Sequence, residues 1–409
     1  MHLFYNLGIA LFDLAVSLAA PFSKRAALLV KGRKTVWDTL GGVSLEGDVI
    51  WVHCASLGEF EQGRPLIEAI RKKNPSYKIV LSFYSPSGYE VRKNYKEADV
   101  VCYLPSDTRA NAKRFISTVN PRMVFFVKYE YWYNYFRELK EVGTPLYLVS
   151  AIFRKDQIFF KWYGGWFRKI LNNVKCFYIQ DEKSAALLDG IGIKAYIVAG
   201  DTRFDRVAAI AAAANPIPVV ENFATGAKVL VAGSTWPADE QIIASYINNS
   251  AKDVKLIIAP HMVDESHIQQ LERRFPLPVC RYTKVKGEIG ADVRVLIIDT
   301  IGLLSAIYRY GSVAYLGGGF GKGIHNTLEA ATYGMPVIFG PRHLKFKEAI
   351  DLKEKGAGFS INDSVEFGNL MERLWDDENK DYLKKSGEAA LEYVQSMCGA
   401  TEEILKLID

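Results

Sequence analysis

The chain has 409 residues, enough for two or three domains with well-buried cores. Hydrophobic residues make up 49% and charged residues 24%, which is typical of a globular protein, and a net charge of +5 is too small to indicate nucleic-acid binding by itself. Five scattered cysteines without a C-x-x-C pair argue against a disulfide framework and fit a reducing cytosol. The histidines lack metal-ligand spacing and no D-x-D motif is present, so we expect no metal site.

The N-terminal segment differs from the rest of the chain. Residues 3–22 are almost all apolar, and a basic cluster follows them over residues 24–34, whereas a secretory signal carries its charge in front. The length suits a spanning helix, but Asp13 in its middle would cost roughly 2.5–3.5 kcal/mol, which a shallow in-plane anchor avoids. We therefore interpret residues 1–35 as a membrane anchor whose basic cluster faces anionic lipid on the cytoplasmic side; the alternative is a buried first helix.

From residue 48 the chain alternates apolar, β-rich runs with polar helical segments at the spacing of βαβ units. Seven runs lie before residue 200, and five more follow residue 228. An alanine-rich stretch broken by Pro216 and Pro218 separates the two series and is typical of a linker. The pattern predicts an α/β fold with two Rossmann-like, doubly wound domains over residues 36–212 and 213–409, the second closed by a helix over 379–409. Because ligands bind at the carboxyl ends of parallel strands, each domain is expected to present one substrate to a shared cleft.

The segment "YLGGGFGKGIHNTLEAATYGMPVIFGP" (315–341) is rich in glycine, yet it matches neither G-x-G-x-x-G nor a P-loop. It predicts a strand, a glycine loop, a helix from about residue 326 and another strand. We expect free backbone N–H groups and the helix dipole in this loop to bind an anion. Glu329 suits either ribose hydroxyls or an N-x-x-E capping box with Asn326, and His325 either contacts a phosphate or packs at the loop.

Residues 128–168 are dense in aromatic and basic side chains. Such interleaving binds single-stranded nucleic acid in some proteins, but it also suits a surface that meets acyl chains and lipid phosphates. Given the N-terminal anchor we favour the lipid surface and expect no nucleic-acid partner, with ordinary helix packing accounting for part of the pattern.

Eight segments follow one another along the chain: "HCASLGEFEQGRPL" (53–66), "KYEYW" (128–132), "GDTRFD" (200–205), "GSTWPADE" (233–240), "APHM" (259–262), "DTIGLL" (299–304), "GKGIHNTLEAA" (321–331) and "FGPRHLKF" (339–346). In this order they resemble the 3-deoxy-D-manno-octulosonate (Kdo) transferases, glycosyltransferases of the GT-B architecture. The resemblance spans nearly the whole chain, including the anchor. It implies lipopolysaccharide synthesis at the cytoplasmic side of a bacterial inner membrane, with CMP-Kdo as donor and a lipid A precursor as acceptor.

The resemblance also implies an inverting mechanism without metal or cofactor, an acceptor site in residues 36–212 and a donor site in residues 213–409. By this resemblance Glu59 is the general base, Glu130 stabilises the transition state, and Arg203 has a similar stabilising role. Ser56, Gly58 and Lys128 lie on the acceptor side. The donor-binding positions are Gly233, Ser234, Pro260, His261, Ile301, Gly302, Leu303, Gly318, Gly319, His325, Asn326, Thr327, Leu328 and Glu329.

Three positions depart from the family pattern. Arg203 stands where the family has lysine, which keeps the charge but changes its geometry. Leu303 stands where the family has glutamate, and no arginine accompanies His261. From position alone, Glu59 follows an apolar strand, where either a general base or first-turn capping is expected. Arg203, Lys128 and Arg154 are candidates for the donor carboxylate. The alternative functions are a GT-B transferase that uses a UDP-sugar on a lipid acceptor, and an inactive membrane-tethered binding protein.

Overall fold

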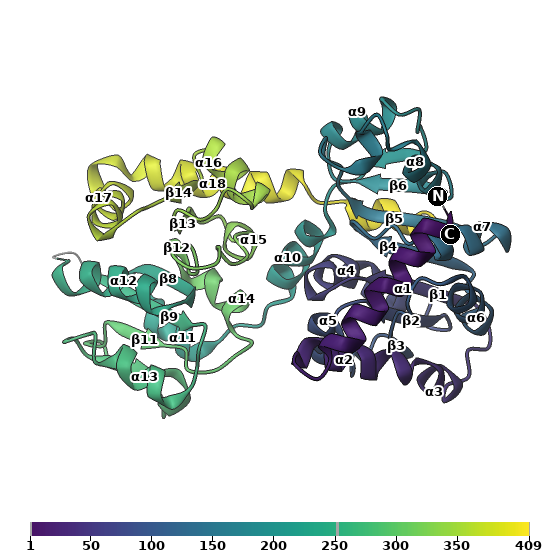
Figure 1. Cartoon of the computed structure of the whole chain (residues 1–409). Helices are drawn as coiled ribbons and strands as arrows, with labels where there is room; N and C mark the ends of the chain where they lie inside the picture. Colours follow the sequence, from purple (N-terminus) through teal and green to yellow (C-terminus); the bar gives the residue numbers. More distant parts are fainter. Residues whose placement is uncertain (1, 251–252, 409) are drawn as a thin grey trace. The chain divides into compact units, whose positions relative to one another are not determined.

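The computed structural model of the protein describes residues 2–250 and 253–408. The chain divides into two compact α/β units, each described by itself here (Figure 1): unit 1 holds residues 2–205 and 398–408, and unit 2 lies within residues 206–397. Each unit is built on a seven-stranded sheet in which neighbouring strands are parallel. The predicted fold class, two doubly wound α/β domains, is confirmed.

The sheet of unit 1 has the strand order β3-β2-β1-β4-β5-β6-β7. Its strands are β1 (Val49–Cys54), β2 (Lys78–Phe83), β3 (Val100–Tyr103), β4 (Met123–Val127), β5 (Leu146–Ala151), β6 (Cys176–Ile179) and β7 (Tyr196–Val198). All seven predicted runs are strands. Every residue of β1, β4 and β5 is buried, because helices cover both faces of the sheet and leave no side of these strands in water.

Helices of unit 1 cover the two faces of this sheet. They are α1 (His2–Ala19), α2 (Lys24–Lys34), α3 (Val36–Gly41), α4 (Leu57–Lys73), α5 (Pro86–Arg92), α6 (Arg109–Val119), α7 (Tyr133–Glu141), α8 (Gly165–Leu171), α9 (Glu182–Asp189) and α19 (Ala400–Leu405). Alternate residues of β1 join different apolar clusters: Trp51 packs with Phe115 and Phe126 on one face, while Ile50 and Val52 pack on the other. The two-residue period of the strand therefore builds both layers of the core.

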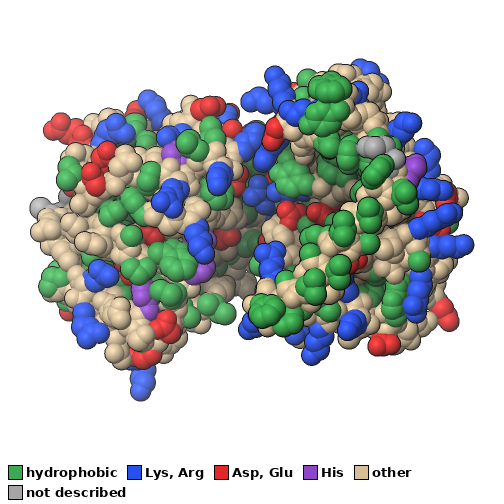
Figure 2. Space-filling view, viewed as in Figure 1, with side chains coloured by type: hydrophobic (Ala, Val, Ile, Leu, Met, Phe, Trp, Pro, Cys, Tyr) green, Lys and Arg blue, Asp and Glu red, His purple; other side chains and the backbone are tan. Residues whose placement is uncertain are grey.

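Helix α1 lies on the surface of unit 1, and none of its residues is buried. One face docks through polar contacts: Tyr5 donates a 2.5 Å hydrogen bond to Asp107, and Asp13 lies 2.9 Å from Arg33 and accepts a hydrogen bond from Ser106 at 2.8 Å. The opposite face exposes large apolar side chains, and Figure 2 shows a band of them with Lys and Arg around it. These are Leu3, Phe4, Leu7, Leu11, Leu14 and Leu18. Helix α1 is therefore not a buried first helix, and its central Asp13 is already neutralised by an ion pair.

The sheet of unit 2 has the order β10-β11-β9-β8-β12-β13-β14. Its strands are β8 (Lys228–Thr235), β9 (Val254–Pro260), β10 (Val279–Arg281), β11 (Val295–Ile297), β12 (Val313–Leu316), β13 (Val337–Phe339) and β14 (Gly358–Ser360). The five predicted runs are strands, whereas β10 and β14 were not predicted. Both are three-residue edge strands that are only partly buried, so neither presents the apolar run that marks the inner strands.

The helices of unit 2 include two in the stretch that we expected to be a linker. They are α10 (Thr202–Ala213), which begins in unit 1, then α11 (Pro218–Ala224), α12 (Pro237–Asn249), α13 (Glu265–Glu272), α14 (Leu304–Ile307), α15 (Leu328–Ala331), α16 (Lys347–Glu354), α17 (Ser364–Leu374) and α18 (Lys380–Ser396). The linker prediction is wrong except for residues 214–217. Pro218 is the first residue of α11, where a helix needs no N–H donor, so this proline begins a helix.

The boundary between the units also differs from the expected division at residues 212 and 213. It lies at residues 205 and 206, and residues 398–408 belong to unit 1 rather than to the second domain. Asp205 accepts hydrogen bonds from the backbone N–H groups of Gly399 (2.6 Å) and Thr401 (2.7 Å), and Ile404 is fully buried in the apolar cluster of β1. The expected single closing helix is two helices, α18 and α19, separated by Gly399 at φ 114°.

Both sheets reverse their strand order at the same relative place. In unit 1 the first strand, β1, lies between β2 and β4. In unit 2 the first strand, β8, lies between β9 and β12. In open α/β sheets the carboxyl ends of the strands at such a switch point form the ligand site. The loops that follow β1, β4, β8 and β12 are therefore the places to look for chemistry.

Candidate active site

The loop after β1 places Glu59 in the first turn of α4. Ser56 is the N-cap residue of this helix: its hydroxyl accepts a hydrogen bond from the N–H of Gly58 at 3.2 Å and donates one to the Glu59 carboxylate. The capping interpretation of this segment therefore holds. A functional role of Glu59 is compatible with this cap. The cap orients the carboxylate, and its remaining lone pairs can accept hydrogen bonds from further donors.

Glu130 follows β4 and lies beside the end of β1. Its Oε2 atom is 3.7 Å from Nε2 of His53, a fully buried residue of β1 whose Nδ1 lies 2.8 Å from the hydroxyl of Ser82. Within the described residues, neither Glu130 Oε2 nor His53 Nε2 has a hydrogen-bond partner. Buried polar atoms usually have partners, so this pair is a candidate for contact with a ligand.

Cys54, the last residue of β1, carries a fully buried thiol. Burial raises its pKa most, and the nearby carboxylates of Glu59 and then Glu130 raise it further. The end of β1 thus carries two negative groups from different strands, and Cys54 itself stays protonated and unreactive at neutral pH. Two carboxylates that share one site can divide acid–base and electrostatic roles.

Lys128 and Tyr129 follow β4 directly. Lys128 has φ 63°, a left-handed conformation that residues other than glycine seldom adopt and that is found more often at functional sites. Burial raises the pKa of the Tyr129 hydroxyl, the Glu59 carboxylate raises it further, and the charges of Arg154 and Arg203 lower it. The charges of Glu59, Arg154 and Arg203 therefore all act on Tyr129, which no sequence motif distinguishes from the neighbouring tyrosines.

Arg203 is held in place by a buried carboxylate. Its Nε and Nη2 atoms lie 3.0 and 2.9 Å from Oδ2 of Asp201, which is 3% exposed and also accepts a 2.8 Å hydrogen bond from Gln62. This fixes the guanidinium plane and offsets part of its charge. The sequence analysis missed Asp201 and Gln62. Their hydrogen bond joins residues that are 139 positions apart, so no local motif indicates it. Unit 1 thus brings together Ser56, Glu59, Lys128, Glu130 and Arg203 at one edge of its sheet.

In unit 2 the glycine loop follows β12, as predicted, but its amide groups differ from our expectation. The N–H groups of Gly317, Gly318, Gly321 and Gly323 donate to Gly233, Asp239 and Gly318 within the unit, and α15 has only four residues. These four glycine N–H groups are therefore not free to bind an anion, while anion binding by the N–H groups at the start of α15 stays a prediction.

The glycines are required by close packing of backbones. A Cβ atom on Gly319 would approach the backbone N of Gly340 to 2.5 Å, and one on Gly317 would collide with the backbone at the end of β8. The end of β8 and the loops after β12 and β13 therefore meet with almost no space between them. Buried Asp239 joins them further: its carboxylate accepts hydrogen bonds from the N–H of Gly318 (2.9 Å), the N–H of Trp236 (2.9 Å) and the hydroxyl of Tyr315 (2.8 Å).

A column of three rings borders this loop. Trp236 stacks on His261 with centroids 4.5 Å apart, and His261 stacks on His325 at 4.9 Å. The indole N–H of Trp236 donates to Nε2 of His325, so the neutral imidazole carries its proton on Nδ1. Burial, and then His261, lower the pKa of His325, so the ring is neutral at pH 7. If it contacts a phosphate it does so as a neutral N–H donor, without a formal charge.

Glu329 is surrounded by polar groups of three segments. Its carboxylate accepts hydrogen bonds from Ser305 (2.8 Å) and from the side-chain amide of Asn326 (3.1 Å), while the Asn326 side chain accepts from the N–H of Leu328. The predicted capping box is therefore replaced by a side-chain pair. Burial lowers the pKa of the partly buried Arg206 guanidinium, and the Glu329 carboxylate opposes that shift; the sequence analysis missed Arg206.

The remaining predicted donor residues lie in the same loops. Pro260 is the last residue of β9, and the N–H of His261 donates to Thr235 at 2.9 Å. Ile301 is 80% exposed, Gly302 has φ 92°, and Leu303 precedes α14. Gly233 is buried against the hydroxyl of Tyr308, and Ser234 adopts φ 52°. Thr327 is fully buried, with no hydrogen-bond partner for its hydroxyl among the described residues.

No group of three or more His, Cys, Asp or Glu side chains in residues 2–250 and 253–408 is placed to bind a metal ion. At the carboxyl edge of its sheet, unit 1 supplies carboxylates and arginines. Unit 2 supplies glycine backbone, stacked rings, a carboxylate and an arginine.

Two solved structures illustrate the likeness in fold. The UDP-GlcNAc 2-epimerase of Neisseria meningitidis superposes with a TM-score of 0.61 at 14% identity over 88% of this chain and 99% of that chain. MurG of Acinetobacter baumannii superposes with a TM-score of 0.56 at 11% identity over 88% and 99%. These likenesses establish the fold, and together with the two parallel sheets they define the class: the protein has the GT-B fold.

Sequence comparison points to one group of glycosyltransferases. A family model described as 3-deoxy-D-manno-octulosonic-acid transferase (kdotransferase) matches residues 23–206, almost all of unit 1. The 3-deoxy-D-manno-octulosonic acid transferase of Rickettsia bellii is 26% identical over 88% of this chain and 87% of its own length, and that of Bordetella pertussis is 27% identical over 88% and 86%. The chain is similar to Kdo transferases over most of its length, and it is a glycosyltransferase.

Proposed function

We propose that the protein transfers Kdo from CMP-Kdo to a sugar hydroxyl of a lipid A precursor, with inversion at the anomeric carbon. The observation that carries the proposal is the placement of two carboxylates at the carboxyl end of β1: Glu59 lies in the first turn of α4, and Glu130 lies 3.7 Å from His53 of β1. A sugar hydroxyl is a poor nucleophile until a base removes its proton, and this edge supplies a carboxylate oriented by Ser56.

In the proposed reaction, Glu59 accepts the hydroxyl proton while the acceptor oxygen bonds to the anomeric carbon of Kdo. The bond from that carbon to the phosphate oxygen breaks, and CMP leaves with the electron pair. Glu130 stabilises positive charge that develops at the anomeric carbon, and Arg203, oriented by Asp201, binds the carboxylate of Kdo or the leaving phosphate. A monophosphate leaving group carries less charge than a diphosphate, so we propose that arginines suffice in place of a metal.

Unit 2 is proposed to bind the CMP moiety. Two oxygens of Glu329 already accept one hydrogen bond each, and a carboxylate has about four acceptor sites, so ribose hydroxyls can donate to the others. The ring column of Trp236, His261 and His325 offers a flat surface and a neutral N–H donor beside the glycine loop. Leu303 supplies no polar contact at the position where the family has glutamate.

We also propose that α1 lies in the plane of the membrane on the cytoplasmic face. Spanning the bilayer would require α1 to leave the contacts of Tyr5 with Asp107 and of Asp13 with Arg33 and Ser106. Lying flat keeps these contacts and buries the exposed leucines in lipid, beside the basic residues of α2.

The test is a turnover assay with CMP-Kdo, a tetra-acylated lipid A precursor in detergent and EDTA, followed by mass. Glu59→Gln is expected to lower kcat by about 10²–10⁴-fold. Glu61→Gln is the matched control, two residues further along α4 and ion-paired with Arg92. Equal turnover by wild type and Glu59→Gln would remove Glu59 as the base. No Kdo transfer, with transfer from UDP-sugars instead, would contradict the proposed donor.

A further inference from the structure

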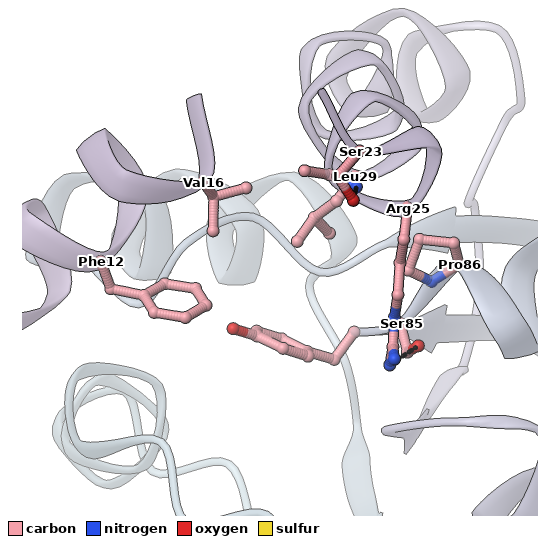
Figure 3. Close-up of a pocket in the computed structure, with 9 residues that line it drawn as sticks. Phe12, Val16, Ser23, Arg25, Leu29, Ser85 and Pro86 are labelled. Carbon is pink, nitrogen blue, oxygen red and sulfur yellow. Dashed lines mark hydrogen bonds between the residues drawn. The ribbon is translucent and has the colours of Figure 1, made fainter. Parts of the chain in front are cut away.

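An apolar cavity of about 270 Å³ lies where α1 and α2 meet the end of β2. Phe12 and Val16 of α1 line it together with Leu29 of α2, and Figure 3 shows these side chains pointing toward the cavity. The opposite wall is formed by the residues that follow β2, Tyr84 to Pro86. The cavity is open to the surface beside Phe12, which is 45% exposed.

This cavity adjoins the proposed acceptor site within unit 1. Tyr84, in its wall, stacks on Trp132 with ring centroids 4.9 Å apart and an angle of 26°. Trp132 comes two residues after Glu130, and β2 pairs along its whole length with β1, which leads to Glu59. A molecule that enters the cavity therefore has its other end near the carboxylates that we assign to catalysis.

Cations stand at the rim of the cavity. The Arg25 guanidinium lines it and donates a 3.0 Å hydrogen bond to Ser85, and Figure 3 shows Arg25 extended alongside Ser85 and Pro86. Arg33 lies over the ring of Tyr84 at 5.0 Å, and Lys24 precedes Arg25 on α2. An apolar interior with basic side chains at the rim is complementary to an anionic amphiphile, whose chain and headgroup need these two surroundings.

The size of the cavity limits what enters it. Pockets that enclose whole drug-sized ligands measure roughly 300–1,000 Å³, so 270 Å³ accommodates a segment of one hydrocarbon chain and not a complete multi-chain lipid. The exposed leucines on the outer face of α1 are available for the remaining chains or for bilayer lipid.

We propose that this cavity binds the headgroup-proximal segment of one acyl chain of the lipid acceptor, with an anionic headgroup at Arg25, and so positions the acceptor sugar near Glu59 and Glu130. The inference rests on the proposed function for the identity of the acceptor. The binding of an acyl chain beside an anionic group can be measured without turnover, so the two proposals fail separately.

The binding test uses a lysophosphatidate whose acyl chain carries a photoreactive diazirine, irradiated with the full-length protein and mapped by peptide mass. Adducts are expected on peptides that contain residues 12–16 and 84–86. Ala26→Phe places a ring in the cavity, and Ala27→Phe adds the same ring at the exposed neighbouring position of α2. Adducts at these peptides should fall at least tenfold in Ala26→Phe only. Equal adducts in both variants, or adducts confined to the outer face of α1, would overturn the proposal.

The activity test compares acylated and deacylated acceptors. Each buried methylene is worth about a fourfold change in affinity, so excluding a few of them should raise KM for the acylated acceptor roughly tenfold or more. KM for CMP-Kdo and for a deacylated acceptor should not change. Phe12→Ser, paired with Val142→Ser at a 53% exposed valine outside α1 as control, repeats the test without adding volume, in case Ala26→Phe lowers the melting temperature. An unchanged KM in both Ala26→Phe and Phe12→Ser would contradict the acyl-chain site. If no variant transfers Kdo, the proposed function fails. The map of adducts still tests whether the cavity binds an acyl chain.

Discussion

The carboxyl edges of the two sheets occupy the same topological position and have different chemistry. The edge of unit 1 is lined by ionisable groups, Glu59, Glu130 and Arg203, which are oriented by Ser56 and Asp201. The edge of unit 2 is lined by glycine backbone and stacked rings. Because both sheets share the strand order around their switch points, the difference comes entirely from the residues that follow the strands. The same arrangement of strands can thus carry groups suited to proton transfer in one unit and groups suited to binding a leaving group in the other.

Both edges also contain a residue other than glycine in a left-handed conformation. Lys128 follows β4 at φ 63°, and Ser234 lies at the end of β8 at φ 52°. Each conformation costs of order 1–3 kcal/mol, and it persists because the neighbouring backbone is fixed by the sheet. The comparison predicts that changes in unit 1 act mainly on kcat and that changes in unit 2 act mainly on donor binding.

The largest effect that tests this division is expected at Glu130. Glu130→Gln keeps the size of the side chain and removes its charge, so kcat should fall by about 10²–10³-fold while the affinity for CMP stays within twofold. Calorimetric titration with CMP and initial rates measure the two quantities. The control is Glu138→Gln on α7, which should change neither kcat nor the affinity for CMP. A large loss of CMP affinity in Glu130→Gln would break the division.

Asp107 gives unit 1 a titratable group that differs from the carboxylates proposed to act in catalysis. It is 2% exposed, and burial raises its pKa to about 6 although Tyr5, Asn134 and Tyr135 donate hydrogen bonds to it. The folded state then binds more protons than the unfolded state between about pH 4 and 6. This group therefore lowers the free energy of unfolding as pH rises through that range, by roughly 2–3 kcal/mol at most.

Asp107→Asn should abolish that pH dependence, and urea unfolding at pH 4.5 and pH 7 measures it. Because Tyr5 belongs to α1, fluorescence from a label on α1 would show whether the helix detaches at neutral pH. An identical pH slope in wild type and variant would mean that Asp107 does not titrate in this range.

In unit 2 the packing of the glycine loop is tested by Gly319→Ala. Its Cβ would approach the backbone of Gly340 to 2.5 Å, so the loops after β12 and β13 must separate, at a cost of typically 1–3 kcal/mol. Thermal unfolding and CMP titration should both show the loss. Gly321→Ala is the control, because its nearest contact would be an ordinary 3.5 Å. Normal CMP affinity in Gly319→Ala would contradict the role of this close packing in the donor site.

The smallest expected effect is at the ring column. Trp236→Ala removes one ring and the hydrogen bond to His325, so CMP affinity should fall about threefold to tenfold, as for a single partly exposed aromatic contact. The turnover number at saturating donor should stay near that of the wild type. Trp162→Ala, at a 91% exposed tryptophan of unit 1, is the control. A change in kcat alone would place Trp236 with the catalytic groups of unit 1.

The sequence was sufficient for the inner strands because buried parallel strands are continuous apolar runs, as in "KIVLSF" and "MVFFV". It was insufficient for β10 and β14, which are short edge strands, and for α10 and α11, where alanines and prolines were interpreted as a linker. The site residues were predicted through family motifs. The groups that orient them were not, because Asp201 and Asp239 act through contacts with distant segments that leave no local pattern.

The return of residues 398–408 to unit 1 has a consequence for dissecting the enzyme. The polypeptide passes between the units twice, so a single proteolytic cut at residues 205 and 206 leaves both fragments joined by the second passage. A shortened protein that ends near residue 205 would lack α19 and would expose the apolar surface that Ile404 covers. Separate expression of the first unit therefore needs the last residues of the chain, supplied by a peptide or by a circular permutation that places them after Asp205.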